Sequence, residues 1–275
     1  MGILKRLCLA FALLMSQVAH AEIETADVVG FVVEYELKGE GREFVVLEAG
    51  GGGGLEDWSG IFERLSQSVR VLRYSRVGNG GSDNPERYFM VEDYAEHLKQ
   101  LLDRLDVAKI IHVAHSYGGS VARVFAAKYP ERVEGLLLID ASSEHDVDIM
   151  RSIDLERANR EIEAVKLDDL RGGKSGHVVD FWAKFPLPDY PAIPDIPVTV
   201  IASVKRYESP GHLLHSDEGR RLWGALWTEW AEAFPKGKAV LTRNSHHLIP
   251  QEEPELVVAE AEEIVARCRA EKSEL

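Results

Sequence analysis

A serine flanked by small residues follows an apolar run in the stretch VAHSYGGS, residues 113–120. Ser116 lies between a predicted buried strand and a predicted helix at residues 118–129, which ends before Pro130. A sharp turn there exposes the hydroxyl above the sheet, at the helix N-terminus where free N–H groups face it. The pattern small-x-Ser-x-Gly is typical of a strand–turn–helix that presents a nucleophile, with Ala114 replacing the usual first glycine.

A serine hydroxyl is a poor nucleophile at neutral pH, so it needs a base, and the base needs an orienting acid. Two adjacent histidines, His246 and His247, lie in the short loop between the last predicted strand and the closing helix. His112 and His115 are nearer to the serine in sequence, but strand and turn geometry favours packing or hydrogen-bonding roles for them. The loop histidines are therefore the candidates for the base.

The elements that must position these residues alternate along the chain. Strand-like runs lie at residues 31–37, 44–49, 69–75, 109–115, 135–141, 198–203 and 238–243, and helical patterns at 92–105, 118–129 and 253–269. Strands that are apolar on both faces and alternate with helices indicate a mostly parallel α/β sheet.

Two regions interrupt this alternation, residues 143–193 and 204–236. Both follow predicted strands at one end of the sheet, so we expect a lid and a long helical excursion over the site. Trp223, Trp227 and Trp230 fall on helical spacing, which favours a packed helix face.

These segments together resemble the α/β-hydrolase superfamily over nearly all of residues 22–275. The similarity rests on VVLEAGGGG with Trp58 (the oxyanion strand and loop), YSRVGNGGSD (Asp-Arg-x-Gly-x-Gly-x-Ser, with Ser75 replacing the Asp), AHSYGG, RVEGLLLIDAS and SHHLIPQEEPE. In the family's Gly-His-x₆-Pro pattern, counting back seven from Pro254 selects His247 as the base. The resemblance implies the α/β-hydrolase fold, a mostly parallel central sheet flanked by helices with a helical lid.

An oxyanion hole is also implied, because a tetrahedral intermediate places negative charge on the former carbonyl oxygen. The N–H group of Tyr117, the residue after the nucleophile, supplies one donor. The family pattern assigns the second donor to Gly51, and the glycine run from Gly50 to Gly54 lets the backbone approach a substrate closely.

The orienting acid has several candidates. The usual family position follows the strand at 198–203, where Arg206 stands near the expected Asp and Glu208 is the nearby carboxylate. The alternative is Asp140, at the carboxyl end of the preceding strand, where α/β sites are built. We expect Asp140 to be the acid, with Glu208 as the alternative; Asp146 and Asp148 remain further candidates.

These residues predict a serine hydrolase that cleaves carboxyl esters of a small-molecule acyl substrate through an acyl-enzyme on Ser116, with no metal or organic cofactor. Lactone or amide hydrolysis, including peptidase activity, is the alternative reaction. Carbon–carbon bond hydrolases and cofactor-free haloperoxidases keep the same serine and histidine, so the motifs do not separate them. A non-catalytic binding protein of the same fold is the alternative class.

The N-terminus has a secretory pattern: basic Lys5 and Arg6, an apolar run of about a dozen residues and a small-x-small site ending at Ala21. We therefore expect residues 1–21 to be a cleaved signal peptide, residues 22–275 to be one hydrolase domain with a cap insertion at approximately 143–193, and the protein to be secreted or periplasmic. The formal net charge of −14 disfavours nucleic acid and anionic membranes as partners, and we expect no stable membrane anchoring.

Overall fold

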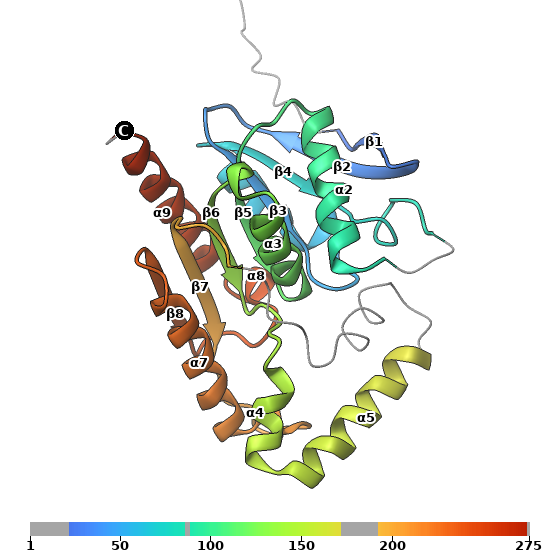
Figure 1. Ribbon diagram of the computed structural model, residues 1–275, viewed down its shortest axis with the longest axis vertical. Helices are drawn as coiled ribbons and strands as arrows, with labels where there is room; N and C mark the ends of the chain where they lie inside the picture. Colours follow the sequence, from blue (N-terminus) through green and yellow to red (C-terminus); the bar gives the residue numbers. More distant parts are fainter. Residues whose placement is uncertain (1–21, 86–88, 172–191, 274–275) are drawn as a thin grey trace, which may run out of the picture.

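A mostly parallel eight-stranded sheet forms the centre of the molecule (Figure 1). The computed structural model describes residues 22–85, 89–171 and 192–273. The strand order is β1-β2-β4-β3-β5-β6-β7-β8, where β1 and β2 are antiparallel to their neighbours and every other pairing is parallel. The strands are β1 (Glu24–Val28), β2 (Phe31–Lys38), β3 (Phe44–Glu48), β4 (Arg70–Tyr74), β5 (Ile110–His115), β6 (Val133–Ile139), β7 (Val198–Ser203) and β8 (Gly237–Thr242).

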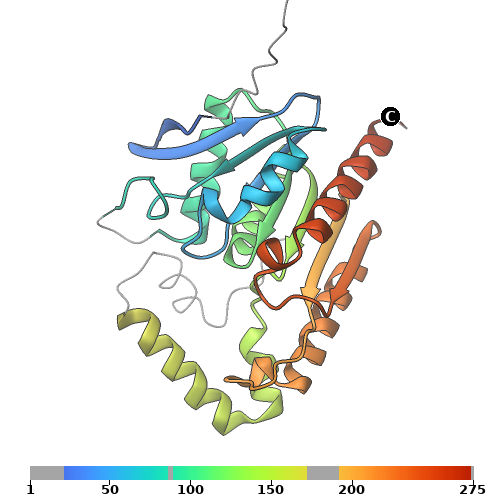
Figure 2. The same cartoon turned by 180° about the vertical axis from the view of Figure 1, so that it is seen from behind.

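Helices cover both faces of this sheet. The described helices are α1 (Ser59–Leu65), α2 (Val91–Arg104), α3 (Tyr117–Lys128), α4 (Asp146–Ile153), α5 (Leu155–Arg171), α7 (Asp217–Glu232), α8 (Ile249–Glu252) and α9 (Pro254–Ser273). Core contacts place α2, α3 and α7 on one face, and α1 and α9 on the other, which Figure 2 shows from behind. The α/β class and the parallel sheet expected from the sequence are confirmed.

The central strands are hydrophobic because both of their faces are covered. Every residue of β3, β5 and β7 is buried, so alternating polar positions would leave polar groups without water. The sequence patterns locate these strands to within one or two residues. They miss β1, an edge strand with exposed residues, and the short helix α1, since neither has a strong apolar period.

The two irregular regions differ in the structure. The described part of residues 143–193 forms α4 and α5, which lie beyond the carboxyl ends of the parallel strands (Figure 1). Residues 172–191, and with them much of the expected cap, lie outside the described residues. Residues 204–236 include α7, in which Trp223 and Trp227 are buried against the sheet, while Arg220 and Trp223 line a cavity next to His247. Trp223 and Trp227 form the packed helix face that their spacing predicts.

The expected signal peptide, residues 1–21, lies outside the described residues. Among the helices that the structure describes, none combines the length and the apolar composition needed to cross a bilayer.

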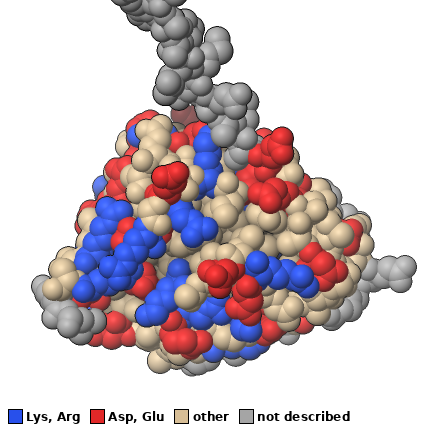
Figure 3. Space-filling view, turned by 90° about the horizontal axis from the view of Figure 1, so that it is seen from above, with Lys and Arg blue, Asp and Glu red and all other residues tan. Residues whose placement is uncertain are grey.

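Charged side chains of both signs mix on the surface. Figure 3 shows Lys and Arg next to Asp and Glu over the face seen from above. Ion pairs that involve α9 include Lys238–Glu260 at 2.7 Å and Arg269–Glu43 at 2.8 Å. The net negative charge is therefore not a uniform acidic field over the face in Figure 3.

Candidate active site

Ser116 occupies a strained turn between β5 and α3. Its backbone has φ +52° and ψ −126°, in a region that a residue with a side chain rarely adopts. Hydrogen bonds hold the turn, because the Ser116 N–H donates to Ile139 O (3.0 Å) and its carbonyl accepts from Gly119 N–H (2.9 Å) and Ser142 N–H (3.0 Å). Such strain persists only where the surrounding structure enforces it.

Two glycines allow this turn to lie close to neighbouring backbone. A Cβ atom on Gly118 would come within 2.5 Å of the Ala49 carbonyl oxygen, at the end of β3. A Cβ atom on Gly119 would come within 2.4 Å of Ala141 Cβ, just after β6. Gly118 and Gly119 are therefore needed because α3 begins in contact with both neighbouring strand ends.

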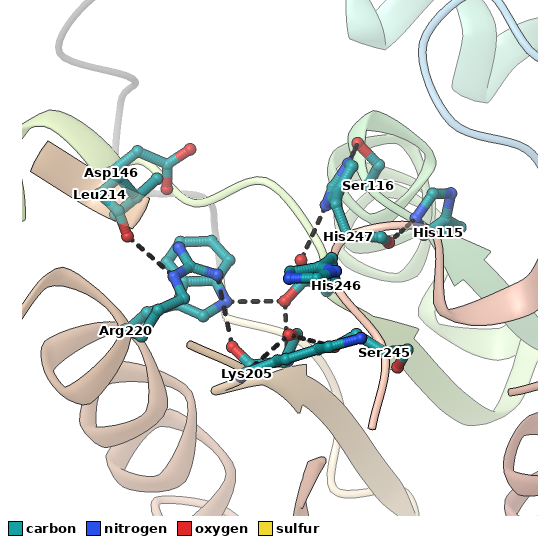
Figure 4. Close-up of polar contacts among 12 residues, drawn as sticks. His115, Ser116, Asp146, Lys205, Leu214, Arg220, Ser245, His246 and His247 are labelled. Atoms are coloured by element: carbon teal, nitrogen blue, oxygen red, sulfur yellow. Dashed lines mark hydrogen bonds and ion pairs between the residues drawn. The ribbon is translucent and has the colours of Figure 1, made fainter. Parts of the chain in front are cut away.

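A continuous line of hydrogen bonds joins Ser116, His247 and Asp140. His247 Nε2 lies 2.9 Å from Ser116 Oγ, and His247 Nδ1 lies 2.7 Å from Asp140 Oδ2. Figure 4 shows the His247 ring next to the Ser116 side chain. Ser116, His247 and Asp140 thus follow one another in space in the order that serine catalysis requires.

Asp140 is the carboxylate that the structure brings to His247. It follows β6 directly, with φ +39°, and its side chain is buried. Its second oxygen, Oδ1, accepts from the Ser203 N–H (3.0 Å) and from Trp223 Nε1 (2.7 Å). Burial alone would raise the pKa of Asp140, but the hydrogen bond and charge of His247, together with the Ser203 N–H, outweigh burial and lower it. Asp140 is therefore held as the anion.

The other acid candidates lie elsewhere. Glu208 is exposed in the loop after β7, and the place beside His247 Nδ1 is taken by Asp140. Asp148 is exposed and lies 3.2 Å from His145 Nδ1. Asp146 accepts from the Ser143 N–H (3.0 Å) and lines a cavity next to His247. The geometry therefore favours Asp140 over the three alternatives.

The two loop histidines have different surroundings. The His246 ring packs against Tyr207 with a centroid distance of 4.3 Å, and its backbone N–H donates to Glu252. His115 lies 2.8 Å, through Nε2, from the carbonyl oxygen of His247, so this nitrogen must carry the proton. Burial and the neighbouring His247 lower the pKa of His115 to about 4, which keeps it neutral. His115 thus has the hydrogen-bonding role that the sequence favours.

Arg76 holds the glycine loop in which Gly51 lies. Its guanidinium donates to the carbonyl oxygens of Ala49 (2.7 Å) and Gly50. A Cβ atom on Gly50 would lie 3.3 Å from Ser116 Cβ, so the loop passes directly beside the nucleophile. Tyr117 is the first residue of α3, where backbone N–H groups point out of the helix end. The loop and the helix end therefore meet at Ser116.

A buried ionic network supports Arg76. Glu48 and Arg76 form an ion pair, and Tyr74 donates to the other oxygen of Glu48, which lies 3.4 Å from His112 Nε2. Burial would raise the pKa of Glu48, but the charge of Arg76 together with the contacts to His112 and Tyr74 outweighs burial and lowers it. The charge of Glu48 and its hydrogen bond likewise raise the pKa of Arg76 against the effect of burial. Both charges therefore stay paired within the fold.

Ser75, which stands where the family pattern has Asp, forms a hydrogen bond with a carboxylate from β2. Ser75 Oγ donates to Glu34 Oε1 (2.6 Å) and accepts from the Leu55 N–H (3.2 Å). A Cβ atom on Gly80 would lie 2.4 Å from Ser75 Oγ, so the segment is closely packed here. A different strand thus supplies a carboxylate next to this position.

The sequence patterns predict no role in the site for three residues that lie next to it: Arg76, Trp223 and Arg220. Arg76 lies in the YSRVGNGGSD segment, so its place in that motif is the sequence feature that could indicate a role near the site. Trp223 and Arg220 come from α7, and local spacing does not show which residues of that helix face Asp140. Within the described ranges, no group of three or more His, Cys, Asp and Glu side chains is arranged to hold a metal ion.

Comparisons with known proteins agree with this architecture. Residues 43–173 match a family model described as the alpha/beta hydrolase fold. The structure resembles an enol-lactonase from Burkholderia xenovorans with a TM-score of 0.64 and 20% sequence identity. The similarity covers 88% of this chain and 100% of the enol-lactonase. The structure also resembles a thermophilic esterase from Thermogutta terrifontis (TM-score 0.63, 21% identity, covering 90% and 99%). The sheet and the strand–turn–helix at Ser116 thus define an α/β-hydrolase fold.

Curated relatives match parts of the chain. An uncharacterized protein of Mycobacterium tuberculosis is 32% identical over 124 residues, 45% of this chain and 36% of that protein. A 2-hydroxy-6-oxo-2,4-heptadienoate hydrolase of Pseudomonas putida is 34% identical over 101 residues, 35% of this chain and 37% of that enzyme. The chain therefore spans little more than a third of the length of these two relatives. The match over residues 43–173 and the similar solved structures therefore show an α/β-hydrolase fold for this chain.

Proposed function

We propose that this protein is a serine hydrolase that cleaves carboxyl esters through an acyl-enzyme on Ser116. The observation that carries the proposal is the unbroken hydrogen-bond line from Ser116 Oγ through His247 to Asp140. The strained backbone of Ser116 and the nearby glycine loop support it, because both features present a nucleophile beside backbone donors.

We propose a role for each group on the basis of this geometry. His247 Nε2 takes the Ser116 proton as Oγ attacks the carbonyl carbon, and Asp140 stabilises the imidazolium through the Nδ1–H hydrogen bond. The N–H groups of Gly51 and Tyr117 stabilise the oxyanion. His247 then gives its proton to the leaving oxygen, which departs as the alcohol. Water, deprotonated by His247, attacks the acyl-enzyme and releases the acid.

The test is hydrolysis of p-nitrophenyl esters, from acetate to palmitate, by the chain lacking residues 1–21. We expect the wild type to turn over and both Ser116→Ala and His247→Ala to lose activity by a factor on the order of 10⁶. Ser120→Ala is the matched control, since this buried serine lies one turn further along α3. A fluorophosphonate should label the wild type and not Ser116→Ala.

The same acyl-enzyme chemistry opens lactones, because a lactone is an internal ester. The enol-lactonase of similar fold is a reason to include lactones, and amides as a third class, in the substrate panel. If the wild type is inert towards all three classes and resists the fluorophosphonate, Ser116 is structural. The protein would then be a binding module of this fold.

We also propose that residues 1–21 direct export to the periplasm or the medium, which the N-terminal pattern supports. N-terminal sequencing of the protein recovered outside the cytoplasm should begin at Glu22. Recovery of an uncut chain from the cytoplasm alone would contradict the proposal.

A further inference from the structure

A cavity of about 190 Å³ lies next to His247, on the side where Asp140 and α7 meet. We call it the Arg220 pocket; besides His247 and Asp140, its walls include Asp146, Tyr207, Leu214, His215, Arg220 and Trp223. Figure 4 shows Arg220 and Asp146 on the other side of the His247 ring from Ser116. The volume is below the roughly 300–1,000 Å³ of pockets that enclose whole ligands, so it suits one group of a substrate.

Arg220 differs from the other two arginines buried in the described part of the chain. Arg76 pairs with Glu48, and Arg123 pairs with Glu144 through two hydrogen bonds of 2.6 Å. Arg220 is only 5% exposed, yet its described partners are two carbonyl oxygens, those of Leu214 (2.8 Å) and Ser203 (3.3 Å). No carboxylate of the described residues lies at ion-pair distance from it.

This arrangement leaves a buried cation with unused donors. A guanidinium has five N–H groups, and Nε and Nη1 of Arg220 each make one hydrogen bond to the described chain. Burial of a charge is costly unless the charge is paired and hydrogen-bonded. The pocket that Arg220 lines is therefore where an anion from outside the chain would be stabilised.

Arg220 is the positive charge of the pocket, and Asp140 is a negative charge that favours the charged form of Arg220. Asp140 already accepts from His247, Ser203 and Trp223. Burial raises the pKa of Asp146 well above its usual range, so this carboxyl favours its neutral form. Burial and the charge of Arg220 lower the pKa of His215 to about 4, so its ring is neutral at pH 7.

The pocket also offers flat aromatic surface. The rings of Tyr207 and His215 stack with a centroid distance of 4.3 Å and an interplanar angle of 11°. Trp223, whose ring lies 5.4 Å from the guanidinium carbon of Arg220, forms another wall. A planar anion fits beside a planar guanidinium and aromatic rings, and the carboxylate has this shape.

We propose that the Arg220 pocket binds a carboxylate on the leaving-group portion of the substrate, so that the enzyme prefers esters of hydroxy acids. The inference rests on the proposed function, because it takes His247 as the group that protonates the leaving oxygen. The part of the substrate next to His247 is then the leaving group. Arg220 fixes that part through charge-assisted hydrogen bonds.

The test compares acetyl esters that differ only in the leaving-group substituent that the Arg220 pocket would bind. We choose 3-acetoxypropanoate and 4-acetoxybenzoate, each beside its neutral primary amide. Wild type should favour the carboxylate member in kcat/KM by about 10- to 100-fold, the range expected for hydrogen bonds to a charged group. Arg220→Gln should abolish this ratio, because kcat/KM falls by about 10- to 100-fold more for the carboxylate member than for the amide member. Arg221→Gln, an exposed neighbour on α7 paired with Glu218, is the matched control and should keep the ratio.

Several results would overturn the proposal. One is a wild type that treats carboxylate and amide alike. Another is an Arg220→Gln variant that loses activity equally on both members, which is the result expected if Arg220 only supports the fold. A preference for p-nitrophenyl hemisuccinate over p-nitrophenyl butyrate that depends on Arg220 would place the carboxylate on the acyl side and contradict the leaving-group assignment.

If Arg220→Gln does not fold, inhibition of the wild-type protein tests carboxylate binding in the Arg220 pocket without this variant. The products 4-hydroxybenzoate and 4-hydroxybenzamide should differ as inhibitors of wild type, with the acid at least tenfold stronger. If no ester is cleaved, calorimetry of the same two compounds with Ser116→Ala still tests the pocket. Failure of binding then counts against the pocket, and failure of labelling by a fluorophosphonate counts against the proposed function.

Discussion

Two buried arginines flank the candidate site in opposite electrostatic settings. Arg76, next to the glycine loop, is paired with Glu48, and its Nη1 and Nη2 atoms also donate to the carbonyl oxygens of Ala49 and Gly50. Among the described residues, Arg220 on α7 donates to two carbonyl oxygens and lies over the Trp223 ring, and it borders a cavity. The same residue type thus holds the backbone on one side of Ser116 and leaves donors for a ligand on the other.

The difference shows how burial should be interpreted for a charged group. A buried charge with a buried counter-ion is explained within the fold, since removal of one partner leaves the other uncompensated. A buried charge that has no carboxylate at ion-pair distance among the described residues, and that faces a cavity, is further stabilised by a ligand of opposite charge in that cavity. Four predictions test whether the side with Arg76 supports the fold and the side with Arg220 takes part in the chemistry.

The largest expected effect is on the α7 side, where Asp140 lies. Asp140→Asn should lower kcat by a factor on the order of 10⁴, because the amide no longer stabilises the imidazolium form of His247. Glu208→Gln is the matched control and should keep wild-type activity, since Glu208 is exposed. Steady-state kinetics on p-nitrophenyl acetate measures both. Loss of activity in Glu208→Gln together with full activity in Asp140→Asn would reverse the assignment.

The second effect is on stability, on the side of Arg76. Arg76→Gln should reduce the free energy of unfolding by about 3–5 kcal/mol, because Glu48 remains buried without its cation. Arg220→Gln should cost less, since no ion-paired carboxylate is left behind. Urea denaturation of the two variants gives the comparison, and the double variant Arg76→Gln/Glu48→Gln should recover part of the loss. Equal destabilisation by both single variants would break the contrast between the two arginines.

The third effect concerns a buried neutral group, His115. Its pKa falls from 6.5 to about 4 on folding, so between these values the unfolded chain binds the proton that the folded protein does not. The stability from this group is therefore present above pH 6.5 and is lost as the pH falls towards 4, by about 3 kcal/mol in total. His115→Gln should flatten the decline. Urea midpoints at pH 7 and pH 5 check the result, and an unchanged slope would contradict it.

The smallest effect is on the support of Asp140 by α7. Trp223→Phe keeps the aromatic ring but removes the Nε1 donor to Asp140 Oδ1, and kcat/KM should fall about tenfold. Trp227→Phe is the matched control, because Trp227 is equally buried on the same helix and packs against Trp223 without contacting Asp140. Equal losses in the two variants would mean that packing, rather than the hydrogen bond, matters at Trp223.

The sequence locates the parts of the site that local pattern defines. Ser116 lies in a strand–turn–helix with small neighbours, and His247 lies in a short loop before a helix, so both can be found from nearby residues. Asp140 was one of several candidates, because the choice depends on which carboxylate can reach His247 in space. The structure resolves the geometry through the contact at 2.7 Å.

The residues from α7 illustrate what sequence patterns omit. An apolar period identifies the helix and its packed tryptophans, but the rotation of the helix against the sheet depends on long-range packing. That rotation brings Trp223 to Asp140 and Arg220 to the cavity. Sequence patterns also do not predict the ion pair of Glu48 and Arg76, because Glu48 ends β3 and Arg76 lies in the loop after β4, so their contact depends on long-range packing.

The loop that carries His247 is attached to the core at three carbonyl oxygens. His115 donates to His247 O (2.8 Å), Ser203 Oγ to Ser245 O (2.7 Å) and Lys205 Nζ to Asn244 O (2.8 Å). His115 and Ser203 belong to buried central strands. The loop is on the surface, yet its opening requires the breakage of bonds to β5 and β7. Its amide protons should therefore exchange with deuterated solvent at rates closer to those of the central strands than to those of other exposed loops.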